Sequence, residues 1–187
     1  MPRALMLTGD AAEELDVMYP LYRVREAGWD CDVAALSRRD VQLVIHDFDP
    51  NSDAYTEKNG RKLPVDVTFA EVDPADYVGL VIPGGRAPEY IRTYADVRRI
   101  TEYFFEQDLP VGTICHGPQV PAVYGLLRGR TTAAFPPLKG DMENAGATVV
   151  DEPDCVDGNM VSCRGWPDMP HWSRAFMTVL ERAAVPA

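Results

Sequence analysis

Residues 111–119 read VGTICHGPQ, and the interpretation of the rest of the chain depends on this stretch. Its first four residues form a short apolar run typical of a buried strand, and residues 119–127 (QVPAVYGLL) have the apolar spacing of a helix. The Gly-Pro pair between the two segments predicts a sharp turn. We therefore expect Cys115 and His116 to lie at a strand-to-helix turn.

A thiol at such a turn is exposed rather than packed, and it lies in the positive field of a helix N-terminus. Together with the neighbouring imidazole of His116, these features favour the thiolate of Cys115. The backbone matches a nucleophile elbow, in which the N–H of the next residue can bind an oxyanion. The alternative is that Cys115 is a small buried hydrophobic residue. The preceding strand and the Gly-Pro pair favour the functional interpretation.

Length and composition predict one domain that covers residues 1–187, because 187 residues with 46% hydrophobic content suit a single sizeable core. The net charge of −11 argues against a surface for nucleic acid or anionic membranes, since phosphate contacts need clustered Lys and Arg. No apolar run approaches the ~20 residues of a membrane span, and the N-terminus does not resemble a signal peptide. These observations predict a cytoplasmic protein.

The cysteines show no CxxC pair and no spacing typical of a disulfide framework, which suits a reducing compartment. They are Cys31, Cys115, Cys155 and Cys163. Cys31 lies in an apolar segment and is expected in the core, whereas Cys163 could be core or could come near Cys115. A zinc site from Cys115, His116, Cys163 and His171 would match none of the usual spacings. We expect no metal ion and no cofactor.

Apolar strand-like segments alternate with helical segments along the chain. The predicted strands are residues 2–8, 29–36, 77–82, 111–114, 130–134 and 147–150, with a short pair flanking 157–159. The predicted helices are residues 13–28, 96–107 and 119–127, one around 139–146, and 168–184. This alternation is typical of an α/β sandwich with a mostly parallel sheet, whose site lies at the carboxyl ends of the strands.

In the first predicted helix, Pro20 should kink or restart the helix. Leu15, Met18, Leu21 and Val24 recur at three-residue steps and are expected to line its core face.

Residues 37–70 depart from the alternation and predict a β excursion from the main sheet. Residues 41–48 and 62–69 look like strands, and Asn59-Gly60 between them is a signal for a hairpin turn. His46 in the first of these segments is interpreted as a structural histidine rather than a ligand.

The strand at 77–82 runs into Pro-Gly-Gly, and a helix is expected to begin near Pro88. Without side chains, Gly84 and Gly85 let backbone N–H groups approach a ligand closely. The alternative is a tight loop with no further role.

Several of these segments together resemble the ThiJ/PfpI superfamily, which includes intracellular protease I and glyoxalase- or deglycase-like proteins. The segments are TGDAAEELDVMYPLYRVREAGW, LVIPGGRAPEYIR, GTICHGPQV, GRTTAAFPPLKGDMENAGA and VDGNMVSCRGWPD. The resemblance implies a flavodoxin-like three-layer sandwich of the class I glutamine amidotransferase type with a nucleophile elbow at Cys115. It also implies a homo-oligomer, either a dimer or a hexamer.

Carried over by motif, Cys115 matches the family's nucleophile and His116 the histidine beside it. The backbone N–H groups of Gly85 and His116 match the oxyanion hole, with Gly84 and Gly117 as further candidates for substrate binding.

The resemblance also assigns acidic residues. Glu89 matches an acid that reaches the histidine from a neighbouring subunit in protease-like members. The family places a carboxylate, usually Glu, four residues before a proline on the first helix; with Pro20 as that proline, the position here is Asp16. Aspartate is one methylene shorter, so it must approach the thiol more closely or act through water. Since neighbouring helix positions differ by about 100°, we favour Asp16 and keep Glu14 as the fallback.

The residues permit covalent chemistry on a carbonyl or a similar electrophile. The first hypothesis is a glyoxalase- or deglycase-like enzyme that converts a small 2-oxoaldehyde to a 2-hydroxy acid. The second is a cysteine peptidase or amidase. Asp16 also resembles the isonitrile hydratase branch, although that branch lacks a histidine after the cysteine. A redox-sensing stress protein, with Cys115 oxidised rather than catalytic, is the hypothesis from another class.

Overall fold

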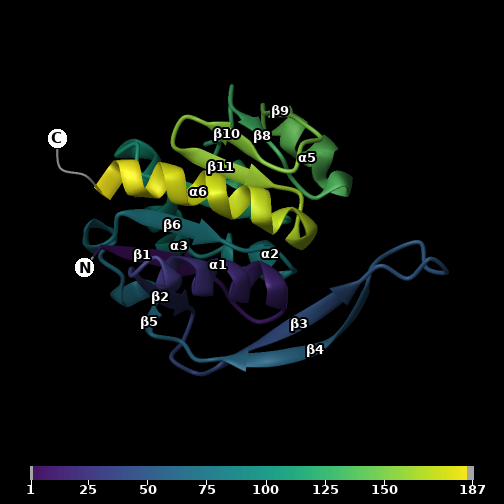
Figure 1. Cartoon of the computed structure of the whole chain (residues 1–187), viewed down its shortest axis with the longest axis horizontal. Helices are drawn as coiled ribbons and strands as arrows, with labels where there is room; N and C mark the ends of the chain where they lie inside the picture. Colours follow the sequence, from purple (N-terminus) through teal and green to yellow (C-terminus); the bar gives the residue numbers. More distant parts are fainter. Residues whose placement is uncertain (1, 185–187) are drawn as a thin grey trace.

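The computed structural model describes residues 2–184 and places a seven-stranded sheet between two layers of helices (Figure 1). The strand order is β10-β11-β7-β6-β1-β2-β5, and each neighbouring pair is parallel except β10 with β11. The strands are β1 (Arg3–Leu7), β2 (Asp30–Ala35), β5 (Val67–Thr68), β6 (Gly79–Ile82), β7 (Val111–Ile114), β10 (Cys155–Asp157) and β11 (Met160–Cys163). The predicted α/β sandwich with a mostly parallel sheet is confirmed.

Both faces of the sheet are covered by helices, which explains why its central strands are continuous apolar runs. In β1, Ala4 and Met6 join the core formed with α1 and α6, whereas Leu5 and Leu7 join the core on the α3 side. The helices are α1 (Glu14–Glu26), α2 (Ala87–Ile91), α3 (Ala95–Glu106), α4 (Gln119–Val123), α5 (Lys139–Asn144) and α6 (Met169–Ala184). None of the described helices is both long and apolar enough to cross a membrane.

The helix α1 runs through Pro20 as one helix, so it does not restart there. Its buried face differs from the sequence prediction. Leu15 is 51% exposed, whereas Leu21 and Val24 are buried together with Val17. At 100° per residue, a step of three residues falls 60° short of a full turn, so Leu15 and Val24 face opposite sides. A stripe of three-residue steps therefore cannot line a single core face over three turns.

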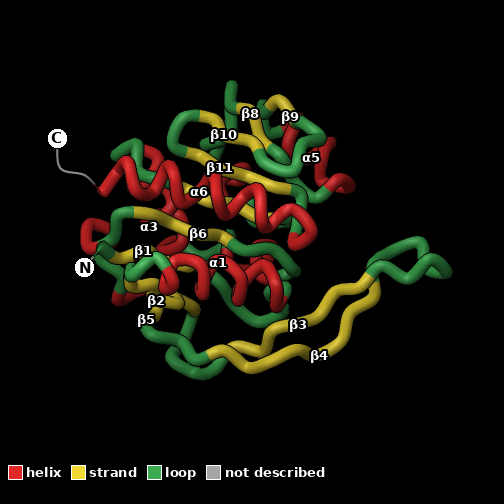
Figure 2. Tube along the Cα trace, viewed as in Figure 1, coloured by secondary structure: helices red, strands yellow, loops and turns green. Residues whose placement is uncertain are grey.

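A long β-hairpin extends from one side of the sandwich (Figures 1 and 2). It consists of β3 (Val41–Asp47) and β4 (Thr56–Leu63), which pair with each other as a separate antiparallel sheet. The prediction of a turn at Asn59-Gly60 is wrong, because both residues lie within β4 and the connection is formed by residues 48–55. Gly60 gives the carboxylate of Glu14 the space it occupies there, since a Cβ atom at this position would overlap it unless the Glu14 side chain moved.

The remaining elements are short. The strands β8 (Thr131–Thr132) and β9 (Thr148–Val149) pair with each other in parallel as a separate small sheet beside α5. Turns of 3₁₀ helix lie at Phe69–Glu71, Pro74–Asp76, Pro136–Leu138 and Trp166–Asp168. The helix α4 is shorter than the predicted 119–127, because Gly125 takes a left-handed conformation with φ of 76° soon after it ends.

Candidate functional site

The cysteine turn at the end of β7 is fixed by backbone hydrogen bonds. Cys115 has φ of 57°, a left-handed conformation that is uncommon for a residue with a side chain. Its N–H donates to the carbonyl of Cys163 on β11 at 3.1 Å, and its own carbonyl accepts from the N–H of Phe135 at 3.0 Å. Such a conformation persists only where its surroundings determine it, and two neighbouring segments do so here.

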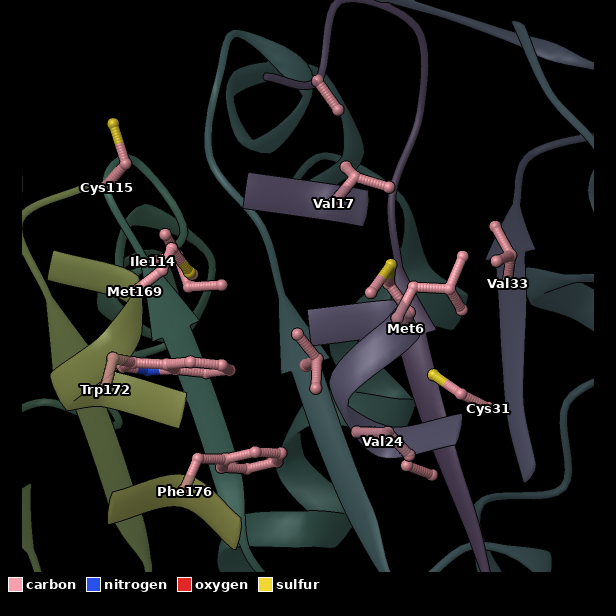
Figure 3. Close-up of a cluster of buried hydrophobic side chains, with 14 of the residues drawn as sticks. Met6, Val17, Val24, Cys31, Val33, Ile114, Cys115, Met169, Trp172 and Phe176 are labelled. Atoms are coloured by element: carbon pink, nitrogen blue, oxygen red, sulfur yellow. The ribbon is translucent and has the colours of Figure 1, made fainter. Parts of the chain in front are cut away.

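The sulfur of Cys115 lies next to the ring of His116, with 3.2 Å between Sγ and Nδ1. Figure 3 shows Cys115 at the end of β7, above Ile114, with its sulfur directed away from the rings of Trp172 and Phe176. The residue is nevertheless only 3% exposed in the free chain. The thiol thus lies at the edge of the core cluster that includes Ile114 and Met169, and it is not open to bulk solvent.

Burial raises the pKa of Cys115 well above its ordinary value, and the nearby carboxyl of Asp16 raises it further. The backbone N–H groups of Gly85 and His116 oppose this rise from their positions beside the sulfur. The expectation of an exposed thiolate is therefore wrong for the free chain, in which Cys115 is a neutral thiol. The loss of hydration outweighs the helix dipole, since α4 is five residues long and begins four residues after the sulfur.

Asp16 lies on α1 and is completely buried next to this thiol. Burial raises its pKa well above the ordinary value, and the charge of Glu13 adds to the rise. The Gly84 N–H and Cys115 oppose it, although neither completes a hydrogen bond of normal geometry with the carboxyl oxygens. Burial thus favours the protonated form of Asp16, whose two carboxyl oxygens have no hydrogen-bond partner within residues 2–184.

Gly84 allows this approach between the acid and the thiol. A Cβ atom at that position would lie 2.5 Å from Oδ2 of Asp16 and 2.5 Å from Cβ of Cys115. Both side chains therefore occupy the space that a larger residue at position 84 would take.

The other candidates from the sequence lie elsewhere. Glu14 turns toward the hairpin and pairs with Arg61 of β4, so it does not serve as the acid beside the thiol. Gly117 donates its N–H to the carbonyl of Ile114 at 2.7 Å, which removes it from the set of oxyanion donors. Glu89 is exposed on α2, and within residues 2–184 of one chain no hydrogen bond joins it to His116.

His116 is a neutral imidazole in this structure. Burial lowers its pKa to about 4, and His46 contributes in the same direction. Its ring stacks on Phe135, with 5.0 Å between the ring centroids. A neutral ring beside a neutral thiol can accept the thiol proton when the sulfur attacks an electrophile.

Sequence reasoning missed the residues that hold the hairpin against this site. Glu13, 1% exposed, accepts from the backbone N–H of His46 at 2.7 Å and from that of Leu15 at 3.2 Å. His46 also places Nε2 2.9 Å from Glu57, whose carboxylate binds the guanidinium of Arg86. His46 is therefore structural, as the sequence indicated, but its partners Glu13 and Glu57 come from two other segments and left no local signal.

A pocket of about 610 Å³ opens over His116. Its walls are Phe135, Pro137 and the hairpin connection, residues 48–55. A second pocket of about 450 Å³ adjoins it, and the stacked rings of Phe48 and Trp166 line that second space. Within the described chain, no group of three or more His, Cys, Asp or Glu side chains is arranged to hold a metal ion.

The fold and this site together define a class: an α/β sandwich that presents a cysteine on a turn at the carboxyl edge of its parallel sheet, with an acid from the first helix beside it. The model of the DJ-1/PfpI family matches residues 2–179. The chain belongs to the DJ-1/PfpI family, and the resemblance seen in the sequence is confirmed.

Relatives match over almost their whole length. A deglycase of Thermococcus kodakarensis is 38% identical over 178 residues, which cover 95% of this chain and 99% of that protein. The deglycase PfpI of Pyrococcus furiosus is 35% identical and covers 96% of this chain and 99% of its own length. Among solved structures, a two-domain protein of Anabaena variabilis with DJ-1/ThiJ/PfpI-like and ferritin-like domains aligns with a TM-score of 0.84 and 27% identity. This chain covers half of that protein's length.

Proposed function

We propose that this protein is a cysteine enzyme of the deglycase and glyoxalase type that converts 2-oxoaldehydes to 2-hydroxy acids. The observation that carries the proposal is the contact of 3.2 Å between Sγ of Cys115 and Nδ1 of His116, with the buried Asp16 on the other side of the thiol. Full-length relatives named deglycases support the same type of reaction.

In the first step, the sulfur of Cys115 adds to the aldehyde carbon while His116 takes the thiol proton. The oxygen of the former carbonyl becomes negative, and the N–H groups of Gly85 and His116 are the donors available to stabilise it. The imidazolium then returns the proton to this oxygen. The product is a hemithioacetal on Cys115, and His116 is neutral again.

In the second step, His116 removes the hydrogen of the former aldehyde carbon and returns a proton to the neighbouring ketone carbon. The hydroxyl proton moves to the ketone oxygen, which leaves a thioester of the 2-hydroxy acid on Cys115. Water hydrolyses this thioester and restores the thiol. One carbon is oxidised while its neighbour is reduced, so the reaction needs no external oxidant.

Asp16 stabilises the negative charge that forms on sulfur. A protonated carboxyl of raised pKa donates a hydrogen bond to a developing thiolate, which an ionised carboxylate would repel. Asp16 and Cys115 thus hold at most one negative charge between them, and the buried acid limits the cost of forming it.

The test compares turnover of methylglyoxal by the wild type, Cys115→Ser and the matched control Cys155→Ser. Loss of the nucleophile should reduce turnover by about 10⁴-fold or more. The half-buried Cys155 lies on β10, outside the site, so its variant should keep full activity. Amide and isonitrile substrates are assayed in parallel. Turnover of methylglyoxal by Cys115→Ser at the wild-type rate, or activity on amides or isonitriles alone, would rule the proposal out.

A further inference from the structure

The hydroxyl of Tyr55 lies at the candidate site and has no structural task. Tyr55 lines the pocket over His116 and comes from the hairpin connection just before β4. Two other half-buried tyrosines use their hydroxyls within the fold: Tyr77 donates to Asp32 and Tyr124 donates to the carbonyl of Arg92. For Tyr55, no such bond is found to any residue between 2 and 184.

The ring of Tyr55 is held by three other rings. His46 lies 4.4 Å from it between centroids, and Phe135 and His116 meet it edge-on at 5.6 and 6.2 Å. Edge-to-face contacts of this length are favourable and restrict the ring. The hydroxyl is therefore placed by packing although it belongs to a connection on the surface.

The anchor of this arrangement is His46. Its Nε2 lies 2.9 Å from Glu57, and its backbone N–H is bound by Glu13 at the start of α1. The same helix carries Asp16 three residues later. The segment that positions Tyr55 is thus tied to the helix that brings the acid to Cys115.

Burial raises the pKa of Tyr55, and an ionised Cys115 would raise it further, as do Glu89 and Glu57. Tyr55 therefore stays protonated at neutral pH and is a hydrogen-bond donor.

We propose that Tyr55 is a catalytic residue that donates a hydrogen bond to the second oxygen of the substrate, the ketone oxygen of the 2-oxoaldehyde. The inference rests on the proposed function. The family's motif residues supply donors for the aldehyde oxygen only, through the N–H groups of Gly85 and His116. The ring contacts with His116 and Phe135 keep Tyr55 at the lining of the pocket over His116, and in the proposed contact its hydroxyl reaches the second oxygen of an adduct on the adjacent Cys115.

The ketone oxygen needs such a donor in one step. When His116 removes the hydrogen of the aldehyde carbon, the electron pair of that bond forms a double bond between the two carbons, and the ketone oxygen becomes negative. The phenol stabilises this charge by a hydrogen bond and keeps its own proton. Because the bond is stronger to the charged oxygen than to the ketone, it accelerates the step rather than only tightening binding.

The experiment compares methylglyoxal turnover by the wild type, Tyr55→Phe and Tyr124→Phe. Tyr55→Phe keeps the ring and its packing but removes the donor, so kcat should fall about 10- to 100-fold with little change in KM. The rate at which iodoacetamide alkylates Cys115 should stay at the wild-type value, since the thiol, His116 and Asp16 are unaltered. Tyr124→Phe removes the same atom from a structural hydrogen bond and should keep wild-type kcat.

Each outcome separates this inference from the function on which it rests. If the wild type does not convert methylglyoxal, the proposed function and the inference are both wrong. If the wild type is active and Tyr55→Phe matches its kcat, the function stands and the inference is overturned. A fall in kcat accompanied by an equal fall in the alkylation rate also overturns it, because the effect then lies in the thiol and not in a contact to the second oxygen.

Discussion

The Cys115 turn and the β3–β4 hairpin meet at one pocket but are held in different ways. The turn is fixed by backbone hydrogen bonds from β11 and from Phe135, inside a sheet that is covered on both faces. The hairpin is held by backbone hydrogen bonds, from Ala11 to Gln42 and from Val44 to Ala12, and in addition by the buried side chain of Glu13, which accepts from the N–H of His46. A substitution can therefore disturb the position of the Cys115 sulfur or the position of the hairpin over His116 separately.

The largest effect is expected at the rigid region, from Asp16→Asn. The amide keeps the shape of the neutral acid but is a much weaker hydrogen-bond donor to the developing thiolate, so turnover of methylglyoxal should fall about 10²- to 10³-fold. The free energy of unfolding of Asp16→Asn should not be lower than that of the wild type. Because the pKa of Asp16 is raised in the fold, the unfolded chain releases this proton at lower pH than the folded chain, and stability declines as pH rises above the ordinary value of 3.8. Asparagine does not titrate, so the variant does not lose stability in this way as the pH rises.

Turnover and urea unfolding at pH 7 check this prediction, with the exposed Glu26→Gln on the same helix as the control. If Asp16→Asn is as active as the wild type, Asp16 has no part in turnover. The Cys115 turn would then be no more sensitive to substitution than the hairpin.

A smaller effect is expected at the junction, from Glu13→Gln. Glutamine has only one carbonyl oxygen, so it can accept from the N–H of His46 or from that of Leu15, and the other N–H then faces the buried NH₂ group. The cost should be about 1–3 kcal/mol, mainly as local opening of the hairpin. Turnover should fall about 10-fold, because the wall over His116 shifts while the thiol remains in place.

Hydrogen exchange resolves the two regions in this variant. Amides in residues 41–63 should lose protection while those of β7 keep theirs, and Glu102→Gln in an exposed ion pair on α3 should change neither. Equal loss of protection in both regions would mean that the hairpin and the turn form one unit.

The smallest effect is expected in acid, through Glu57. Hydrogen bonds from Arg86, and then from His46, lower the pKa of Glu57 to about 2 from an ordinary value of 4.5. Its stabilising contribution is therefore complete above about pH 4.5 and is lost as pH falls toward 2. The carboxylate is 29% exposed, so solvent weakens the effect.

Protection of the hairpin amides, followed from pH 6 to 2 in the wild type and in Glu57→Gln, measures this contribution as a difference between the two proteins. The difference should shrink as the pH falls. A constant difference would show that the ion pair with Arg86 does not hold the hairpin.

The family and the layered fold could be predicted because their signals are local. An apolar run, a cysteine and a Gly-Pro pair are adjacent in the chain, and the alternation of side chains along a strand follows from backbone geometry. The hairpin connection was misplaced for a related reason. Asn59-Gly60 is a genuine turn signal, but Gly60 serves the approach of Glu14 from α1, which no local pattern shows.

The sequence alone determined that Cys115 lies on a turn between a strand and a helix in a DJ-1/PfpI sandwich. Only the tertiary structure decided that its thiol is neutral, that Asp16 and not Glu14 faces it, and that Tyr55 stands over His116. Chain order sets which backbone conformations are possible. Protonation states and pocket walls depend instead on burial and on charges brought together from distant segments, and these exist only after folding.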